Sequence, residues 1–542
     1  MEDMVKGDCN MSKTFNTTGV CIPEKHYMVD LGSRLKAIKS LVDTDSYFVI
    51  NKARQYGKTT TLRALCKYLQ NEYYVCFMDF QTFGNVDFSS EYAFAAAFSH
   101  TFTDLFEYKK SQKTNNLEKA ILSLEQDTCE PDFALRLLFK DLKKVCQAAD
   151  KPVVLMIDEV DSASENQVFV DFLAQLRSMY LSRDIQPAFK SVILAGVYDV
   201  KNLKLKIRSG EEHKYNSPWN IAADFNVDMS FSKTEIAGML AEYESDHQTG
   251  MDIDHMSGLI FDYTSGYPFL VSRLCQLLAR NYEAQTVEEL RKKVWMNEGF
   301  NTVMRLILAE KNTLFESLSE KLISYPELNT MLQAILFTGK TITYNYYELS
   351  INIATMFGFV KNQNGVLMIA NRIFETWLYN LYLSASEFQN SPIYSASTID
   401  KNQFIIGGRL NMRLILEKFV AHFHELYGDS SEKFIEEEGR KYFLLYLRPI
   451  INGTGNYYIE ARTREQKRTD IIVDYKGEQY IIEMKIWHGQ EYNNRGEKQL
   501  FEYLQAYNVN IGYMLSFNFN KKKNIGVHDV IFENKKIIEA IV

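Results

Sequence analysis

Short apolar runs alternate with longer helical stretches over roughly the first 235 residues of this 542-residue chain. Each run is four to eight residues long and rich in Val, Ile, Phe or Tyr, as buried parallel strands are. The runs lie at Tyr47 to Ile50, Tyr73 to Phe80, Val153 to Ile157, Val192 to Ala195 and roughly Phe225 to Phe231. This alternation predicts an α/β domain over residues 1–235, with a parallel sheet and helical crossovers.

The pattern changes twice further along the chain. Between about residues 235 and 385, stretches such as EIAGMLAEYES and FLVSRLCQLLARNYE place apolar residues three and four apart, which predicts helices. Within this region, GFVKNQNGVLMIANRIF predicts a small hairpin. The polar, turn-rich residues 389–404 predict a linker. Residues 405–542 predict a second α/β domain with the order helix, three strands, helix, strand.

Composition and charge narrow the class of protein. The hydrophobic share of 46% and the charged share of 24% are ordinary globular values. The net charge of −8 excludes a globally basic nucleic-acid coat and leaves only a local groove for such a partner. No uncharged apolar run reaches membrane-spanning length, and the N-terminus lacks the apolar core of a secretory signal. The seven cysteines are odd in number and include no C-x-x-C, which predicts reduced thiols in a cytoplasmic protein. Because no apolar run is long enough to span a bilayer, no membrane partner is expected.

A phosphate-binding loop is indicated by YFVINKARQYGKTTTLRAL, residues 47–65. A strand runs into a loop that ends Gly57-Lys58-Thr59-Thr60, and a helix follows, so loop amides and the helix N-terminus would face phosphates. Lys58 would reach the β and γ oxygens, and the Thr59 hydroxyl would ligate Mg²⁺. Lys52 stands where the full pattern has its first glycine. The alternative is an exposed loop in which Gly-Lys-Thr occurs by chance.

An acidic strand end supports the nucleotide hypothesis. Residues 153–161, VVLMIDEVD, form an apolar run that ends in two carboxylates. Asp158 at the strand tip would hold Mg²⁺ through water, and Glu159 would polarise an attacking water as general base. The alternative is a buried strand with a solvated acidic end.

Together these residues resemble P-loop ATPases of the AAA-like class, in the branch with a catalytic glutamate beside the magnesium aspartate. The first 380 residues resemble more closely a bacterial AAA-ATPase-like family whose loop typically reads Arg-Arg-Phe-Gly-Lys-Ser/Thr. Other matching stretches are HYMVD, NSPWNIA and TSGYPFLVSRL. The resemblance implies ATP as the ligand. It also implies nucleotide contacts from Arg54, Gln55, Tyr56, Gly57, Lys58, Thr59 and Thr60.

The same resemblance implies two further segments. A helical lid is expected over 236–310, with Gly266-Tyr267-Pro268 near the phosphates and Pro268 at the nucleotide, although Pro268 also suits a plain helix start. Arg208 and Arg273 are candidate γ-phosphate sensors. A winged-helix-like segment is expected over 311–388, and it would either bind DNA or pack on the ATPase as a rigid arm.

A second candidate site lies in YYIEARTREQKRTDIIVDYKGEQYIIEMKIWH, residues 457–488. Three strands fit this stretch: Tyr457 to Arg462, Thr469 to Tyr475, and Gln479 to Trp487. Asp470 lies at the start of the second strand, and Glu483 and Lys485 project to one face of the third. A carboxylate and a lysine on a buried strand are costly unless paired or metal-bound. Asp470 and Glu483 could therefore hold Mg²⁺ or Mn²⁺, and Lys485 could position or deprotonate the bound water. The alternative is an exposed hairpin with salt-bridged charges.

The spacing Asp-x12-Glu-x-Lys resembles the PD-(D/E)XK nuclease superfamily, with Thr469 in place of the proline. A helix expected from Glu432 to Leu447 precedes the strands, and either Glu438 or Glu460 could add an acidic ligand by this resemblance.

A helix expected from Gly496 to Tyr507 carries Gln499 and Tyr503, the Gln-x-x-x-Tyr pair typical of RecB-type members of that superfamily. Positions four apart share a helix face, so both side chains could point at the site. A last strand is expected from Ile511 to Phe519.

The two resemblances imply one function. They indicate a bacterial, cytoplasmic ATPase fused to a metal-dependent nuclease that cleaves nucleic acid, with DNA favoured and homo-oligomerisation left open. Phosphate contacts could come from the basic residues of RTREQKR, which equally suits a solvated turn: Arg462, Arg464, Lys467 and Arg468. The alternative function is a non-cleaving, nucleotide-switched DNA-binding or regulatory protein that uses the nuclease fold as a docking module.

Overall fold

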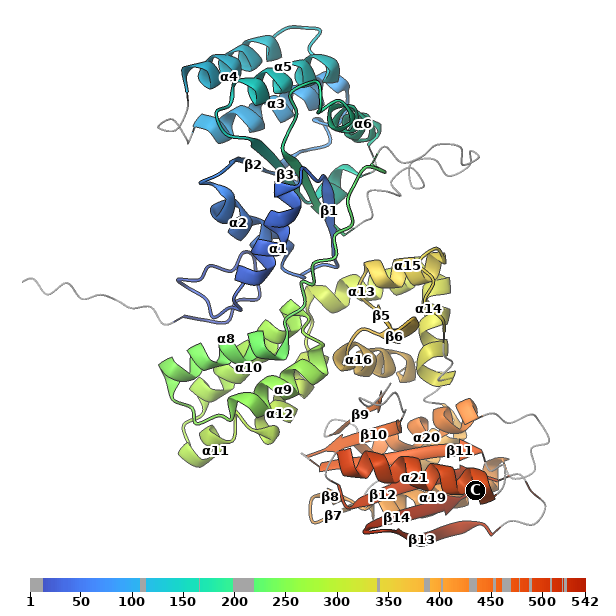
Figure 1. Ribbon diagram of the computed structural model, residues 1–542. Helices are drawn as coiled ribbons and strands as arrows, with labels where there is room; N and C mark the ends of the chain where they lie inside the picture. Colours follow the sequence, from blue (N-terminus) through green and yellow to red (C-terminus); the bar gives the residue numbers. More distant parts are fainter. Residues whose placement is uncertain are drawn as a thin grey trace, which may run out of the picture. The chain divides into compact units, whose positions relative to one another are not determined.

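The structure is a computed structural model of the chain, and its contacts divide it into two compact units. The first comprises Met1–Glu242, Tyr267–Ser272 and Met356–Gly358, and the second comprises Tyr243–Gly266, Arg273–Thr355 and Phe359–Val542. Figure 1 gives the element labels used below. The described residues are 13–107, 114–164, 166–197, 219–338, 342–384, 390–400, 403–427, 436–451, 455–460, 469–476, 478–486, 490–506, 509–518, 520 and 524–542.

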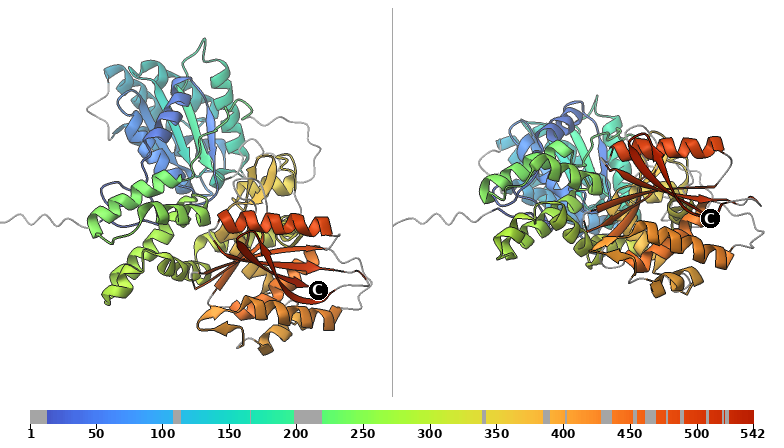
Figure 2. Two further views of the ribbon diagram at one scale, coloured as in Figure 1. Left: turned by 60° about the horizontal axis from the view of Figure 1, so that its bottom comes forward. Right: turned by 90° about the horizontal axis from the view of Figure 1, so that it is seen from below.

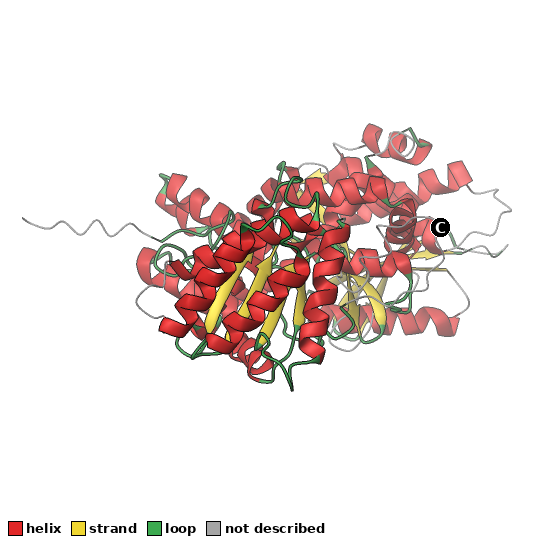
Figure 3. Cartoon of the chain, turned by 90° about the horizontal axis from the view of Figure 1, so that it is seen from above, coloured by secondary structure: helices red, strands yellow, loops and turns green. Residues whose placement is uncertain are grey.

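The first unit is built on a parallel sheet with the strand order β1-β4-β3-β2. Its strands are β1 (Phe48–Asn51), β2 (Tyr74–Asp79), β3 (Val153–Asp158) and β4 (Ser191–Gly196). Every residue of β3 and β4 is buried, because helices cover both faces of the sheet, as Figure 3 shows. The predicted α/β core with crossover helices is therefore confirmed.

The helices of this unit connect the strands in chain order. They are α1 (Gly32–Asp43), α2 (Lys58–Leu69), η1 (Phe80–Thr82), α3 (Glu91–Glu107), α4 (Asn115–Thr128), α5 (Leu135–Ala148), η3 (Val160–Ala163) and α6 (Gln167–Leu181), with α8 (Lys233–His247) at its end. An aromatic-rich core joins helices and sheet, including edge-to-face contacts of Phe80 with Phe94 and of Phe94 with Phe172.

The predicted strand at Phe225 to Phe231 is wrong. In this region the backbone pairs with the sheet only through an isolated parallel bridge between Ala223 and Phe48. The buried guanidinium of Arg34 in α1 donates to the carbonyls of Asp228 and Ser230 at 3.1 and 3.2 Å. The Arg34 side chain thus satisfies two backbone carbonyls that would otherwise be free to pair with a neighbouring strand. The apolar character of this run was therefore not enough to predict a strand.

The second unit begins with a helical region and a small hairpin. The elements of this region are α9 (Ile253–Thr264), α10 (Pro268–Ala284), α11 (Glu288–Lys292), α12 (Asn297–Ala309), α13 (Thr313–Ser324), α14 (Pro326–Gln333), the π-helix η5 (Ala334–Thr338), α15 (Leu349–Met356), β5 (Val360–Gln363), β6 (Val366–Ile369) and α16 (Arg372–Leu383). The start of α10, as far as Ser272, and the last residue of α15 belong to the first unit. The hairpin predicted from GFVKNQNGVLMIANRIF is confirmed, since β5 and β6 pair antiparallel. Asn364 and Gly365 at its turn both have positive φ.

The predicted linker at 389–404 is wrong in part, because α18 (Pro392–Asp400) is a helix within it. The stretch starts Ser391-Pro392, and proline is well suited to the first turn of a helix. Ile393 is fully buried, so tertiary packing adds to this local preference.

The C-terminal part contains a six-stranded sheet in the order β13-β14-β12-β11-β10-β9. Its elements are β7 (Ile405–Ile406), β8 (Arg409–Leu410), α19 (Met412–Tyr427), α20 (Glu436–Ile451), β9 (Gly455–Glu460), β10 (Thr469–Tyr475), β11 (Glu478–Ile486), α21 (Gln490–Ala506), β12 (Ile511–Phe517), β13 (Gly526–Phe532) and β14 (Lys535–Ile541). Figure 2 shows α21 on one face of the sheet and α19 and α20 on the other. Among the described residues, no helix has the length and apolar character to cross a membrane.

The predicted order of helix, three strands, helix and strand is confirmed for α20 through β12, with α20 shifted to end at Ile451 instead of Leu447. The expectation of Ile511 to Phe519 as the last strand is wrong, because β13 and β14 follow. β14 inserts beside β12 in parallel and buries Ile537, Ile538 and Ala540.

Candidate functional site

The phosphate-loop residues of the first unit come together at the carboxyl end of its sheet. Gly57 has φ of +78°, a left-handed conformation that glycine adopts without strain, and α2 begins at the next residue. The Thr59 hydroxyl donates to the Asp158 carboxylate at 2.6 Å. Thr59 and Asp158 are 99 positions apart in the chain, and both were predicted to serve one magnesium site. The fold brings their oxygens into contact.

Lys58 is held within the loop by its own backbone. Its side chain is buried, and its ammonium donates to the carbonyls of Lys52 and Ala53 at 2.9 and 3.1 Å. Burial lowers the pKa of Lys58, and the negative charges of Glu159 and its acidic neighbours oppose that shift. The ammonium is therefore held inside the loop by two backbone carbonyls.

Three carboxylates lie at and just after the end of β3, and their surroundings differ: Asp158, Glu159 and Asp161. Asp158 is buried, and burial raises its pKa while the hydrogen bond from Thr59 opposes the shift. Glu159 adopts a left-handed conformation, and burial also raises the pKa of its half-buried carboxyl. Asp161 is structural, since it accepts the Val197 N–H at 2.6 Å. Oxygen ligands at Thr59 and Asp158 fit Mg²⁺, which prefers such donors.

Sequence reasoning missed a fourth acid, Asp79, at the tip of the neighbouring strand. β2 and β3 pair in register so that Asp79 lies opposite Asp158. The charge of Asp79 contributes to the raised pKa of both Asp158 and Glu159. The signal was available, because YVCFMD also ends an apolar run in an aspartate.

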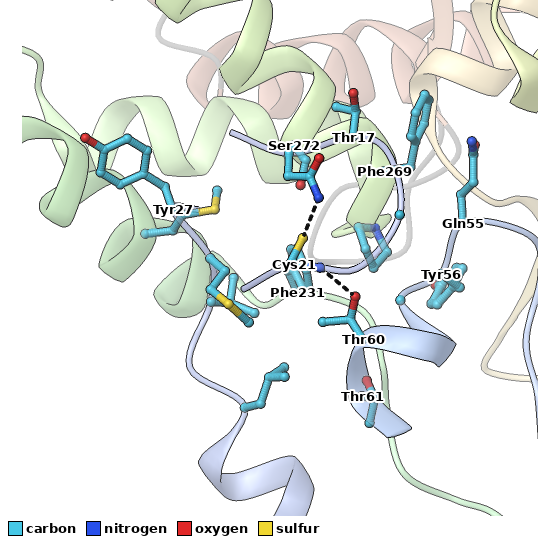
Figure 4. A pocket seen from close by; sticks show the side chains of 18 of the residues that line it. Thr17, Cys21, Tyr27, Gln55, Tyr56, Thr60, Thr61, Phe231, Phe269 and Ser272 are labelled. Carbon is cyan, nitrogen blue, oxygen red and sulfur yellow. Dashed lines mark hydrogen bonds between the residues drawn. The ribbon is translucent and has the colours of Figure 1, made fainter. Parts of the chain in front are cut away.

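A pocket of about 360 Å³ adjoins the phosphate loop within the first unit. Figure 4 shows Tyr56 and Thr60 of the loop on one side, with Cys21, Phe231 and Phe269 around the same hollow. Its lining combines the loop with the N-terminal segment and the first turn of α10: Asn16, Thr17, Thr18, Gly19, Cys21, Tyr27, Met28, Val29, Leu31, Arg34, Gln55, Tyr56, Gly57, Thr60, Thr61, Phe231, Met239, Pro268, Phe269 and Ser272. A mainly apolar hollow beside a phosphate loop suits a nucleoside.

The N-terminal segment lines part of this pocket, which the sequence analysis did not predict. HYMVD was noted only as a matching stretch, yet it supplies Tyr27, Met28 and Val29. The backbone N–H of Cys21 donates to the Thr60 hydroxyl at 3.2 Å, which ties this segment to α2.

Tyr267 and Pro268 lie beside the phosphate loop within the first unit. The Tyr267 hydroxyl donates to the Arg54 carbonyl at 2.5 Å, and its ring meets Tyr56 edge-on at 4.7 Å. Pro268 is also the first residue of α10. A position beside the phosphate loop and a plain helix start are therefore compatible for this proline.

The expected sensor role of Arg273 is not supported by its contacts. Its guanidinium binds the Glu310 carboxylate through both Nε and Nη2 and is also bonded to Gln276. This pairing between α10 and the residue that follows α12 gives the arginine a structural task in the second unit. Arg208 lies outside the described residues.

The second site forms around β11 in the C-terminal sheet. Glu483 and Lys485 are both buried, at 5% and 6% exposure, and they share one face because they are two residues apart. Ile471 in β10 pairs with Ile482 in β11, and continuing this antiparallel register by one residue brings the backbone of Asp470 opposite Glu483. Tyr503 is buried on α21. The side chains of Asp470, Glu460, Gln499 and Glu438, and all of 461–468, lie outside the described part.

Three polar residues missed by sequence reasoning lie near Lys485. In the sheet register Ser516 of β12 pairs with Lys485, and the Ser516 hydroxyl donates to Glu539 of β14 at 3.1 Å. Burial and the charge of Glu539 raise the pKa of Glu497 in α21, while Lys485 opposes this shift. Buried carboxylate and hydroxyl oxygens are the donors that hard divalent cations prefer. Within the described side chains, no group of three or more His, Cys, Asp or Glu forms a metal cluster.

The parallel sheet, the phosphate loop and the acidic tip of β3 together define a P-loop ATPase fold in the first unit. A family model described as AAA-like domain matches residues 26–383, and the chain belongs to this family. A model described as PD-(D/E)XK nuclease superfamily matches residues 456–528, so an AAA-like ATPase domain is fused to a nuclease-family domain. The predicted resemblances to an AAA-like ATPase family and to the PD-(D/E)XK nuclease superfamily are confirmed.

Solved structures match the chain at low identity. A Walker-type ATPase of Pyrococcus abyssi matches with a TM-score of 0.45 and 15% identity, covering 67% of this chain and 99% of that one. The Aeropyrum pernix ORC2 protein in its ADPNP-ADP complexes matches at 0.35 and 12%, covering 68% and 98%. The Aeropyrum pernix ORC1 protein in complex with DNA matches at 0.28 and 11%, covering 65% and 93%. No curated protein matches the chain in sequence.

Proposed function

We propose that the first unit binds and hydrolyses Mg-ATP. Lys58 would bind the β and γ phosphates, and Thr59 with Asp158 would hold the magnesium ion. The hydrogen bond between Thr59 and Asp158 supports this proposal, because it brings two oxygen ligands together beside the start of α2. Glu159 would orient the attacking water, and its raised pKa makes it a better base than an ordinary glutamate.

We propose that the C-terminal domain is a nuclease that cleaves phosphodiester bonds in nucleic acid, with DNA as the first substrate to test. The observation that carries this proposal is the burial of Glu483 and Lys485 on one face of β11, beside the strand whose second residue is Asp470. Two opposite charges are placed there at a desolvation cost that simple stability does not require.

Each residue has a defined task in this proposal. Asp470 and Glu483 would hold Mg²⁺ or Mn²⁺, which lowers the pKa of bound water and stabilises charge on the phosphate. Lys485 would orient the nucleophilic water and neutralise the phosphate. Gln499 and Tyr503 on α21 would contact the substrate near the same face, and Glu460 would serve as an additional acidic ligand.

The test is a cleavage assay on linear and circular DNA, with Mg²⁺ or Mn²⁺ and with or without ATP. Glu483→Gln and Lys485→Ala should each lose cleavage. Glu533→Gln and Lys498→Ala are matched controls at exposed positions and should cut like wild type. Equal cutting by wild type and Glu483→Gln would contradict the assignment.

Comparing cleavage with and without ATP also tests whether nucleotide binding at the first site controls cleavage at the second. We propose that nucleotide binding gates cleavage, so Lys58→Ala should change the rate of cutting without removing the metal-dependent activity. If wild type cuts neither DNA nor RNA under any nucleotide condition, the docking-module function replaces the nuclease.

A further inference from the structure

Gly496 occupies an unusual place for a glycine, within α21 six residues from its first residue. Glycine in a helix interior costs about 1 kcal/mol relative to alanine. Its backbone does not adopt the positive φ that would require a glycine. Its small size must therefore be explained by what lies next to it.

The neighbour is the end of the Lys485 side chain. A Cβ built on Gly496 would lie 1.2 Å from Lys485 Nζ and 2.2 Å from Cε, so the ammonium fills the space that any other residue would need. Apart from its chain neighbours and the nearby backbone of its own helix, the three atoms nearest to that Cβ position all belong to Lys485. The contact thus joins one backbone position of α21 to the charged group of β11.

A different glycine shows what simple helix packing looks like in this domain. A Cβ on Gly512 in β12 would meet Leu504 and Leu500 of α21 at 2.8 and 3.0 Å, which is an apolar contact between helix and sheet. Gly496 instead meets a flexible ammonium. Adding a methyl group there would displace the lysine head far more easily than it would displace the helix.

The surroundings of Lys485 make its position matter. The side chain is buried, and a buried ammonium needs carboxylates or polar atoms around it. Glu497 follows Gly496 on α21, and the charges of Glu539 and Lys485 both act on its carboxyl. Ser516 lies beside Lys485 in the sheet register.

We propose that Gly496 is a positioning residue of the nuclease site: it provides the space that holds the Lys485 ammonium against α21, on the same face as Glu483. This inference rests on the proposed nuclease function. The lysine would be held in one place before substrate arrives, which lowers the cost of ordering a long, flexible side chain.

The first experiment compares Gly496→Ala with Gln505→Ala, an exposed position on the same helix. Gly496→Ala should keep Mn²⁺ binding by calorimetry and lose cleavage at least tenfold, because the carboxylates stay and the lysine head moves. Gln505→Ala should cut like wild type. Wild-type cleavage by Gly496→Ala would overturn the proposal.

The second experiment is a double-mutant cycle on the full chain that does not depend on activity. Hydrogen exchange of the α21 amides is measured for wild type, Gly496→Ala, Lys485→Ala and the double variant. Alanine at 496 should reduce protection when Lys485 is present and should be neutral or protective when residue 485 is alanine. Additive effects in the cycle would show that Gly496 serves helix packing alone.

The two experiments separate the possible failures. If wild type does not cut nucleic acid, the nuclease function fails, and the exchange cycle still decides whether Gly496 holds the lysine. If wild type cuts and the cycle is additive, the function stands and the role of Gly496 is rejected.

Discussion

Tyr263, near the end of α9, donates a hydrogen bond from its hydroxyl to the buried carboxylate of Asp474 in β10. The guanidinium of Arg372 lies 5.5 Å from the centre of the Tyr263 ring. α9 belongs to the helical region expected to form a lid, and β10 is the strand that begins with Thr469 and Asp470. This contact therefore joins the helical region to the nuclease sheet inside the second unit.

Tyr263→Phe should weaken this connection measurably. It removes one donor from a buried carboxylate, which costs about 1–3 kcal/mol. Hydrogen exchange of the β10 and α9 amides should become faster. Tyr347→Phe, which alters a 94% exposed tyrosine, is the control and should leave exchange unchanged.

The same pair predicts a pH dependence. Burial raises the pKa of Asp474, and its hydrogen bonds with Tyr263 and Gln479 only partly oppose the shift. A carboxyl whose pKa is raised on folding contributes stability that is complete below its ordinary value of 3.8 and is lost as pH rises through the raised pKa. We therefore expect the hydrogen-exchange protection of the β10 amides in wild type, measured relative to Asp474→Asn, to fall as pH rises from 3.8 through the raised pKa of Asp474. A difference that grows with pH would contradict the assignment.

At the nucleotide site, Glu159→Gln should separate binding from hydrolysis. The amide keeps the shape of the side chain and loses the base, so ATP turnover should fall by about 10²–10⁴-fold while affinity by calorimetry stays close to wild type. Lys58→Ala should instead lose tight Mg-ATP binding. Unchanged turnover in Glu159→Gln would reject the general-base role.

The pocket beside the phosphate loop can be tested through Cys21, which lines it. Burial raises the pKa of this thiol, so alkylation should be slow at neutral pH and faster as pH rises. Mg-ATP should protect Cys21 in peptide-level mass spectrometry. Cys129 is exposed and does not line the pocket, so its labelling should be unaffected. Equal labelling of Cys21 with and without ATP would place the nucleoside elsewhere.

The nuclease residues should behave as one unit. Because metal, water and lysine act together in the proposed reaction, Glu483→Gln combined with Lys485→Ala should lose little more cleavage than either single variant. Mn²⁺ binding should distinguish them, since Glu483→Gln should weaken it and Lys485→Ala should spare it. Additive losses in cleavage would indicate that the two residues serve separate tasks.

Features carried by short stretches of sequence could be predicted. A strand, a Gly-Lys-Thr loop and a helix are local signals, and so is an apolar strand that ends in Asp158 and Glu159. The spacing of Glu483 and Lys485 fixed their common face, because side chains alternate along any strand. Local signals failed where a side chain distant in sequence bonds the backbone. Arg34 donates to the carbonyls of Asp228 and Ser230, and the strand predicted there does not form.

By itself the sequence therefore determined the two α/β domains and the phosphate-loop motif, and it nominated candidate residues for each site, since these depend on local spacing and hydrophobic periodicity. Only the tertiary structure decided which distant groups meet them. It brought Thr59 against Asp158, closed the pocket with Tyr27 and the start of α10, and placed the Lys485 ammonium at Gly496. Such contacts depend on how helices and strands pack in three dimensions, and a periodic pattern along one element carries no information about its partner.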